Sequence, residues 1–102
     1  MSQKIIETID NELKMLVERF MENTNLEVAT LIEASKKSDF LTINRIGHNM
    51  KGSALNYGFK HLADLGRSIE KAGANEDVEN IKQLLISLKD YVARVEIKFE
   101  RN

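Results

Sequence analysis

Residues 76–99 read EDVENIKQLLISLKDYVARVEIKF, and this stretch carries the clearest periodic pattern in the chain. Its apolar residues alternate in steps of three and four positions: Val78, Ile81, Leu85, Leu88, Val92, Val95 and Phe99. Such spacing places them along one seam of an α-helix, as in left-handed helical bundles. The stretch therefore predicts one long helix that packs against others.

The rest of the chain also favours helix, because it has no proline, only five glycines and many Leu, Ile, Glu and Lys residues. Thr24 followed by Glu27 fits a capping box. Ser38 and Asp39 precede a new apolar run, and Gly73 resembles a helix end. We therefore predict five helices, at about 10–23, 25–37, 39–56, 58–73 and 76–99.

These helices define an all-α fold class. With 102 residues the chain is long enough for one hydrophobic core, so we expect a single domain over residues 1–102. Short loops favour antiparallel neighbours. The predicted architecture is an antiparallel up-down four-helix bundle with an additional N-terminal helix packed across one end.

Charge and composition exclude several classes of function. The 15 basic and 16 acidic residues give a net charge of -1, without the basic excess of a nucleic-acid-binding protein. The chain has no cysteine, which excludes disulfides and thiolate metal sites. No segment approaches the roughly 18 apolar residues of a membrane span or resembles a signal peptide. We expect a cytoplasmic protein that binds neither nucleic acid nor membrane.

The third predicted helix has one feature that core packing does not explain. At about 100° per residue, its core residues lie on one side: Ile43, Ile46, Gly47, Met50, Ala54 and Tyr57. His48 lies about 140° away from them and should be exposed to solvent. Asn44 and Lys51 are on the same side as His48. A lone exposed histidine is usually without function, so the neighbours of His48 decide whether it belongs to a site.

Gly52 follows His48 by one helical turn, and on an outer face a glycine costs roughly 1 kcal/mol relative to alanine. The missing side chain would let another protein's backbone approach the imidazole. Lys51 would place a positive charge beside the ring, unless it is an ordinary surface lysine. Leu41 and Leu55 are apolar on the same outer face and could form a docking rim, although Leu55 could instead pack on a neighbouring helix.

These residues also carry a family resemblance. The stretch 48–54, HNMKGSA, with Gly58 ten positions after His48, resembles the signature of the histidine-containing phosphotransfer (HPt) domain. The helical layout is similar to that family over nearly the whole chain. Departures are mild: Asn49 and Met50 stand where a Thr-Leu pair is commoner, and Gly47 stands where alanine is commoner.

The resemblance implies that His48 accepts a phosphoryl group and exchanges it with an aspartate of a response-regulator receiver domain, with a sensor histidine kinase as the original donor. The chain has no phosphate-binding glycine loop and no acidic cluster for Mg²⁺, so the metal ion is expected on the receiver domain. We therefore expect no cofactor and no metal of its own, a monomer, and a phosphoryl carrier rather than an enzyme.

A hairpin of the third and fourth helices, folded near Tyr57, would bring Gly47 opposite Gly66 or Arg67 and Glu70 near His48. In the similar phosphoacceptor domains of chemotaxis kinases, a glutamate at this position accepts a hydrogen bond from the inner imidazole nitrogen. Such a contact would select the tautomer of the ring.

Other interpretations remain open. Glu70 could pair with Arg67 or Lys71 on its own helix. The Leu41 and Leu55 surface could serve a helical protein-interaction module that is never phosphorylated. Metal binding through His48 and His61 is the weakest alternative, because neither histidine has a ligand partner at i, i+4. We interpret His61 as a surface residue.

Overall fold

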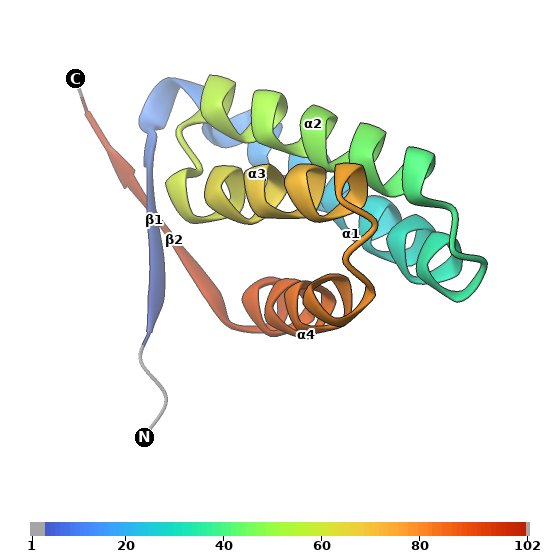
Figure 1. Cartoon of the computed structure of the whole chain (residues 1–102). Coiled ribbons are helices and arrows are strands. Elements are labelled where there is room, and N and C mark those ends of the chain that lie inside the picture. The colour runs from blue at the N-terminus through green and yellow to red at the C-terminus, as the bar shows by residue number, and fades with distance from the viewer. Residues whose placement is uncertain (1–3, 102) are drawn as a thin grey trace.

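The computed structural model describes residues 4–101, and this part of the chain is mostly helical (Figure 1). It contains four α-helices: α1 (Lys14–Lys36), α2 (Phe40–Tyr57), α3 (Lys60–Ala74) and α4 (Val78–Arg94). The remaining elements are short: strand β1 (Ile5–Asp10), a 3₁₀ turn η1 (Asn11–Leu13) and strand β2 (Val95–Glu100). Each helix contacts the next, and α4 also contacts α1, so the four helices enclose one core.

The predicted break between the first two helices is wrong, and so is the additional N-terminal helix. Helix α1 runs without interruption through Thr24. The Thr24 hydroxyl donates a hydrogen bond of 3.0 Å to the Phe20 carbonyl, one turn earlier in the same helix, and its side chain is buried. The buried stripe continues across the supposed boundary at helical spacing: Val17, Phe20, Thr24, Val28 and Leu31. A capping-box pattern therefore lies inside a helix here.

The C-terminal end of the predicted last helix is also wrong, because α4 ends at Arg94 and β2 follows. Strand β2 pairs with β1 in parallel, from Ile5 opposite Val95 to Asp10 opposite Glu100. The segment VEIKFE alternates partly buried and exposed residues, which is the period of a strand. The first and last strands of the described chain thus lie side by side next to the bundle, with its two ends at opposite ends of the strand pair (Figure 1).

Close contact between α2 and α3 depends on glycines. A Cβ atom added to Gly66 would lie 2.6 Å from the Lys51 backbone nitrogen and 3.0 Å from the Gly47 carbonyl oxygen. One added to Gly47 would collide with the backbone of Glu70 and Gly66. The predicted hairpin therefore brings Gly47 and Gly66 together. It also places Glu70 at the level of His48.

Gly73 contributes to the same contact. An added Cβ there would lie 2.7 Å from the backbone nitrogen of Asn44. The prediction that a helix ends at Gly73 is correct to within two residues, because α3 ends at Ala74 and Asn75 is its C-cap. Its main structural role, however, is to let α3 approach α2.

The N-terminus of α3 is capped by a residue from β1. Glu7 is only 2% exposed, and its Oε1 and Oε2 accept hydrogen bonds from the backbone N–H groups of His61 (3.2 Å) and Leu62 (3.1 Å). The Tyr91 hydroxyl of α4 donates to the same Oε2 over 2.8 Å. Burial, and then this hydrogen bond, raises the pKa of Tyr91 and keeps the phenol protonated as a donor. One side chain thus joins β1, α3 and α4.

No helix within residues 4–101 is long and apolar enough to cross a membrane.

Candidate functional site

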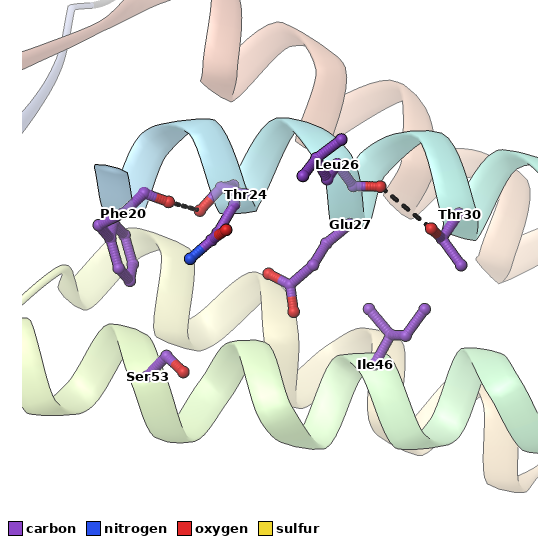
Figure 2. Close-up of a pocket in the computed structure, with 8 residues that line it drawn as sticks. Phe20, Thr24, Leu26, Glu27, Thr30, Ile46 and Ser53 are labelled. Carbon is purple, nitrogen blue, oxygen red and sulfur yellow. Dashed lines mark hydrogen bonds between the residues drawn. The ribbon is translucent and has the colours of Figure 1, made fainter. Parts of the chain in front are cut away.

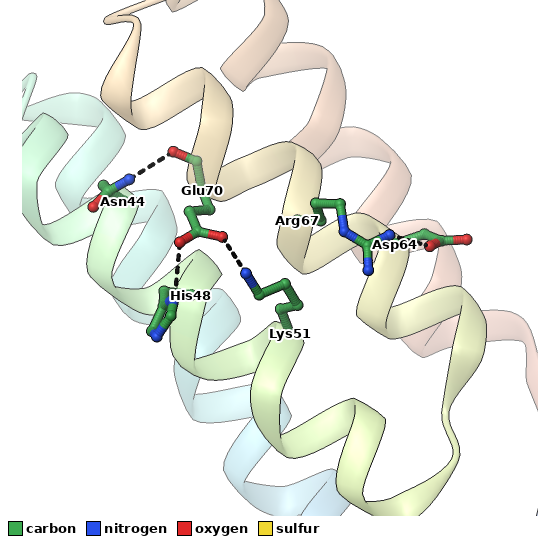
Figure 3. Close-up of polar contacts among 6 residues, drawn as sticks. All are labelled: Asn44, His48, Lys51, Asp64, Arg67 and Glu70. Atoms are coloured by element: carbon green, nitrogen blue, oxygen red, sulfur yellow. Dashed lines mark hydrogen bonds and ion pairs between the residues drawn. The ribbon is translucent and has the colours of Figure 1, made fainter.

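His48 lies on the solvent side of α2, and its side chain is 63% exposed. Its Nδ1 atom is 2.8 Å from Oε2 of Glu70 on α3 (Figure 3). The other ring nitrogen, Nε2, is on the far side of the imidazole and points away from Glu70 (Figure 3). The predicted proximity of Glu70 to His48 is therefore present, and it leaves Nε2 accessible.

Glu70 also contacts Lys51, whose Nζ donates a hydrogen bond of 2.9 Å to Oε1. The hydrogen bond from Lys51, and then the one from His48, holds the pKa of the Glu70 carboxyl below its ordinary value of 4.5. Glu70 is therefore an ionised acceptor at neutral pH. Because a carboxylate cannot donate, the proton between the two groups belongs to Nδ1, and Nε2 of a neutral ring carries the lone pair.

Asn44 has a role that its sequence position did not reveal. Its Nδ2 donates a hydrogen bond of 2.8 Å to the backbone carbonyl oxygen of Glu70. Asn44 lies one turn before His48, so it fixes the backbone of Glu70 while His48 and Lys51 fix its carboxylate. We predicted Asn44 on the partner-binding surface, and the structure gives it this contact between helices. A polar residue at i−4 from His48, on the side facing α3, is the signal that could have indicated it.

The alternative in which Glu70 pairs with Arg67 or Lys71 on its own helix is wrong. Arg67 pairs instead with Asp64, over 3.0 Å between Nη1 and Oδ1. Both partners of the Glu70 carboxylate, His48 and Lys51, come from α2. The site is therefore built across the glycine contact between two helices rather than along one of them.

The surface around His48 has open space at one glycine and two exposed leucines. A Cβ atom added to Gly52 would meet no other atom within 4 Å, so this glycine faces open space. Leu41 is 82% exposed and Leu55 54% exposed, so neither is used in core packing. His61, on α3, is exposed as well. Within residues 4–101 no group of three or more His, Asp or Glu side chains is placed to hold a metal ion.

The sequence of residues 15–97 matches the Hpt domain family. The chain belongs to this family. No curated protein and no solved structure gives a match. Members of the family transfer phosphoryl groups through a histidine in phosphorelays, and they act as carriers between kinases and receiver domains rather than as catalysts.

The matched residues of this Hpt domain include all four helices except the first residue of α1, and β1 lies outside them. The site offers one accessible nucleophilic nitrogen, a carboxylate that holds the opposite nitrogen, and one ammonium group. Phosphoryl transfer depends mainly on positioning and on neutralising charge around the phosphate. The arrangement can therefore present an acceptor atom for a phosphoryl group.

Proposed function

We propose that this Hpt domain accepts a phosphoryl group on Nε2 of His48 and exchanges it with the aspartate of a response-regulator receiver domain. The observation that carries the proposal is the contact between Nδ1 and Glu70, because it holds the ring with Nε2 free and exposed. A sensor histidine kinase is the original donor in this scheme. The domain acts as a monomer in the cytoplasm.

In transfer from the receiver domain, the Nε2 lone pair attacks the phosphorus of phosphoaspartate. The N–P bond forms, the P–O bond to the aspartate breaks, and the electron pair leaves with the aspartate carboxylate. Nδ1 keeps its proton, and the Glu70 carboxylate stabilises the positive charge that develops on the ring. Lys51, which donates to Glu70 over 2.9 Å, supplies positive charge beside the phosphoryl group. The receiver domain supplies Mg²⁺.

The docking face consists of Leu41, Gly52 and Leu55 around His48. Asn44 of α2 lies at its edge facing α3, where it holds the backbone of Glu70. Gly52 leaves room for the active-site loops of the receiver domain. Leu41 and Leu55 provide exposed apolar surface that a partner can bury. This combination suits a partner that must bring its aspartate within bonding distance of Nε2.

The test is to incubate the pure protein with a panel of phosphorylated receiver domains and to follow acid-labile label. His48→Gln should keep the helical fold and lose the label completely. His61→Gln is the matched control, because His61 is an exposed histidine outside the site. Full labelling of the His48 variant would overturn the proposal.

A second candidate is an interaction module that is never phosphorylated, favoured by the exposure of Leu41 and Leu55. The His48→Gln variant separates the two functions. In an interaction module it would keep full activity in binding and signalling, whereas in a phosphorelay it binds the receiver domain without exchanging phosphoryl groups.

A further inference from the structure

A cavity of about 330 Å³ lies between α1 and α2. Figure 2 shows the Glu27 side chain reaching from α1 across this cavity, with its carboxylate toward Ile46 and Ser53 of α2. The volume is at the lower end of the range for ligand pockets, which is about 300–1,000 Å³. The cavity suits one side chain better than a large ligand.

Glu27 has no hydrogen-bonding or ionic partner for its carboxylate within residues 4–101. Of the three hydroxyl groups that line the cavity, that of Thr24 donates to the Phe20 carbonyl, that of Thr30 donates to the Leu26 carbonyl, and that of Ser53 makes no hydrogen bond to Glu27 (Figure 2). Partial burial raises the pKa of Glu27, with no opposing cation. The Glu27 carboxylate is only partly buried and still reaches solvent, and a cation placed beside it would offset the partial desolvation that raises its pKa.

The cavity lies at the same level of α2 as His48. Two of its lining residues, Ile46 and Ser53, lie two residues before and five residues after His48. The point midway between them is therefore about 2 Å from His48 along the axis of α2. Asn49, Gly52 and Ser53 are exposed on the part of α2 between His48 and the cavity, together with Arg45. The path from His48 to the cavity over Gly52 and Ser53 carries no bulky side chain, and the exposed Arg45, one turn before His48, borders it.

The size of a protein interface makes simultaneous contact feasible. Ile46 and Ser53 lie about 140–160° around α2 from His48, so the cavity is on the α1 side of the helix and His48 is on its solvent side. A standard interface buries about 800 Å² on each partner, which is enough to span the width of one helix. A protein docked over His48 thus has the area to reach the cavity as well.

We propose that the cavity binds a lysine or arginine side chain of the receiver domain, with Glu27 as its counter-ion. The proposal rests on the proposed function, because the receiver domain is the partner that docks on His48. Leu26, exposed at the rim, would pack on the methylene groups of the bound side chain. Glu27 would then select receiver domains that carry a cation at the matching position, without taking part in the transfer itself.

The first test does not need a receiver domain. N-acetyl-arginine methylamide is titrated into the isotope-labelled full chain, and the uncharged citrulline analogue serves as the control ligand. Only the arginine probe should give saturable shifts at Thr30 and Ser53, and it should lower the pKa of Glu27 toward the ordinary value. Glu27→Gln should abolish both effects. Equal shifts with citrulline, shifts retained in the variant, or no shifts at all would overturn the proposal.

The second test measures transfer from receiver domains that phosphorylate the wild-type chain. Glu27→Gln should lower the transfer rate about tenfold at subsaturating receiver concentration, leave the maximal rate unchanged, and weaken the dependence on salt. Glu22→Gln is the matched control, since Glu22 is exposed on α1 and does not line the cavity. Equal rates in both variants, or a lower melting temperature for Glu27→Gln, would overturn the proposal.

The two tests separate the two proposals. If no receiver domain labels the wild-type chain, the phosphorelay function is wrong, and the arginine probe still reports on the cavity. If labelling occurs and the probe does not bind near Glu27, only the cavity proposal is wrong.

Discussion

Glu70 and Glu7 are two glutamates that bind in the same way and serve different purposes. Each uses both carboxylate oxygens to join elements that are distant in sequence. Glu70 accepts from the side chains of His48 and Lys51 on α2. Glu7 accepts from two backbone N–H groups of α3 and from Tyr91 of α4. The first carboxylate is partly open to solvent and the second is buried.

The difference shows how surroundings decide what a carboxylate does. Glu7 satisfies donors that are buried or partly buried, so its removal leaves them without their partner. Glu70 orients side chains that water could also solvate, so its removal affects the ring of His48 more than the fold. We therefore expect Glu7 to govern stability and Glu70 to govern transfer.

The largest expected effect is on stability at Glu7. Glu7→Ala should lower the free energy of unfolding by about 3 kcal/mol, because it removes a helix cap and leaves the Tyr91 hydroxyl unpaired. Transfer by the folded fraction should stay near that of the wild type. Urea denaturation measures the free energy of unfolding. The control is Glu96→Ala, whose contact with Lys4 is exposed, and it should change stability by less than about 0.5 kcal/mol. Similar losses of stability in both variants would contradict the role of Glu7 as a buried helix cap.

The glycine contact beneath Glu70 should give the next largest effect. Gly47→Ala should cost about 2 kcal/mol, since the new methyl group meets backbone that cannot move aside. It should also slow transfer, because α3 must shift and carry Glu70 away from His48. Thermal unfolding and transfer rates should fall together. A variant with wild-type stability would show that the helices separate more easily than their spacing indicates.

Replacing Glu70 should affect transfer more than stability, which is the reverse of the result expected for Glu7. Glu70→Ala should slow transfer about 10- to 100-fold, because the tautomer of His48 is no longer selected. The free energy of unfolding should change by less than about 1 kcal/mol, as expected for a partly exposed ion pair. Lys51→Ala should also slow transfer without preventing folding. Unchanged rates in both variants would remove these residues from the mechanism.

Gly52 should separate stability from function on the open side of His48. Gly52→Ala should raise the free energy of unfolding by roughly 0.5–1 kcal/mol, because the position is helical and no atom lies near the new Cβ. Gly52→Gln should also be neutral or stabilising, yet it should cut transfer more sharply than alanine does. Melting temperature and transfer rate should therefore move in opposite directions. A loss of stability would place Gly52 against another element, and unaltered transfer would show that no partner approaches there.

The smallest expected effect is the pH dependence of the Glu70 contacts. The pKa of Glu70 is lowered in the folded chain, so its contribution to stability is complete above the ordinary value of 4.5 and is lost as the pH falls through the lowered pKa. The stability difference between the wild type and Glu70→Ala should shrink between about pH 6 and pH 3. Urea titrations of both proteins at each pH measure it. A stability difference that grows on acidification would contradict the lowered pKa of Glu70.

Much of the His48 site could be predicted from sequence. Helical phase alone indicated that His48 and Gly52 face outward. The distance of Glu70 from the turn near Tyr57 indicated which residue of α3 lies beside the ring. These inferences succeeded because a helix has a constant rise and rotation, so positions within one hairpin follow from counting residues.

Other features could not be obtained by counting. Val95 and Phe99, four residues apart, continue the helical seam of α4, and with Ile97 they also fit the alternation of a strand. The pairing of β2 with β1, more than 80 positions away in the chain, decides between the two patterns. In the same way the unbroken core stripe of α1, rather than the local signal at Thr24, decides that no helix ends there.

The sequence by itself therefore determined the helical class, the exposed face of α2 and the hairpin that joins His48 to Glu70, because these depend on periodicities within short segments. Only the tertiary structure decided the parallel strand pair, the cap that Glu7 provides 54 residues before His61, and the cavity in which Glu27 lacks a partner. Each of these depends on the register between segments far apart in the chain. Such a register is selected by packing and burial, and no local pattern of residues records it.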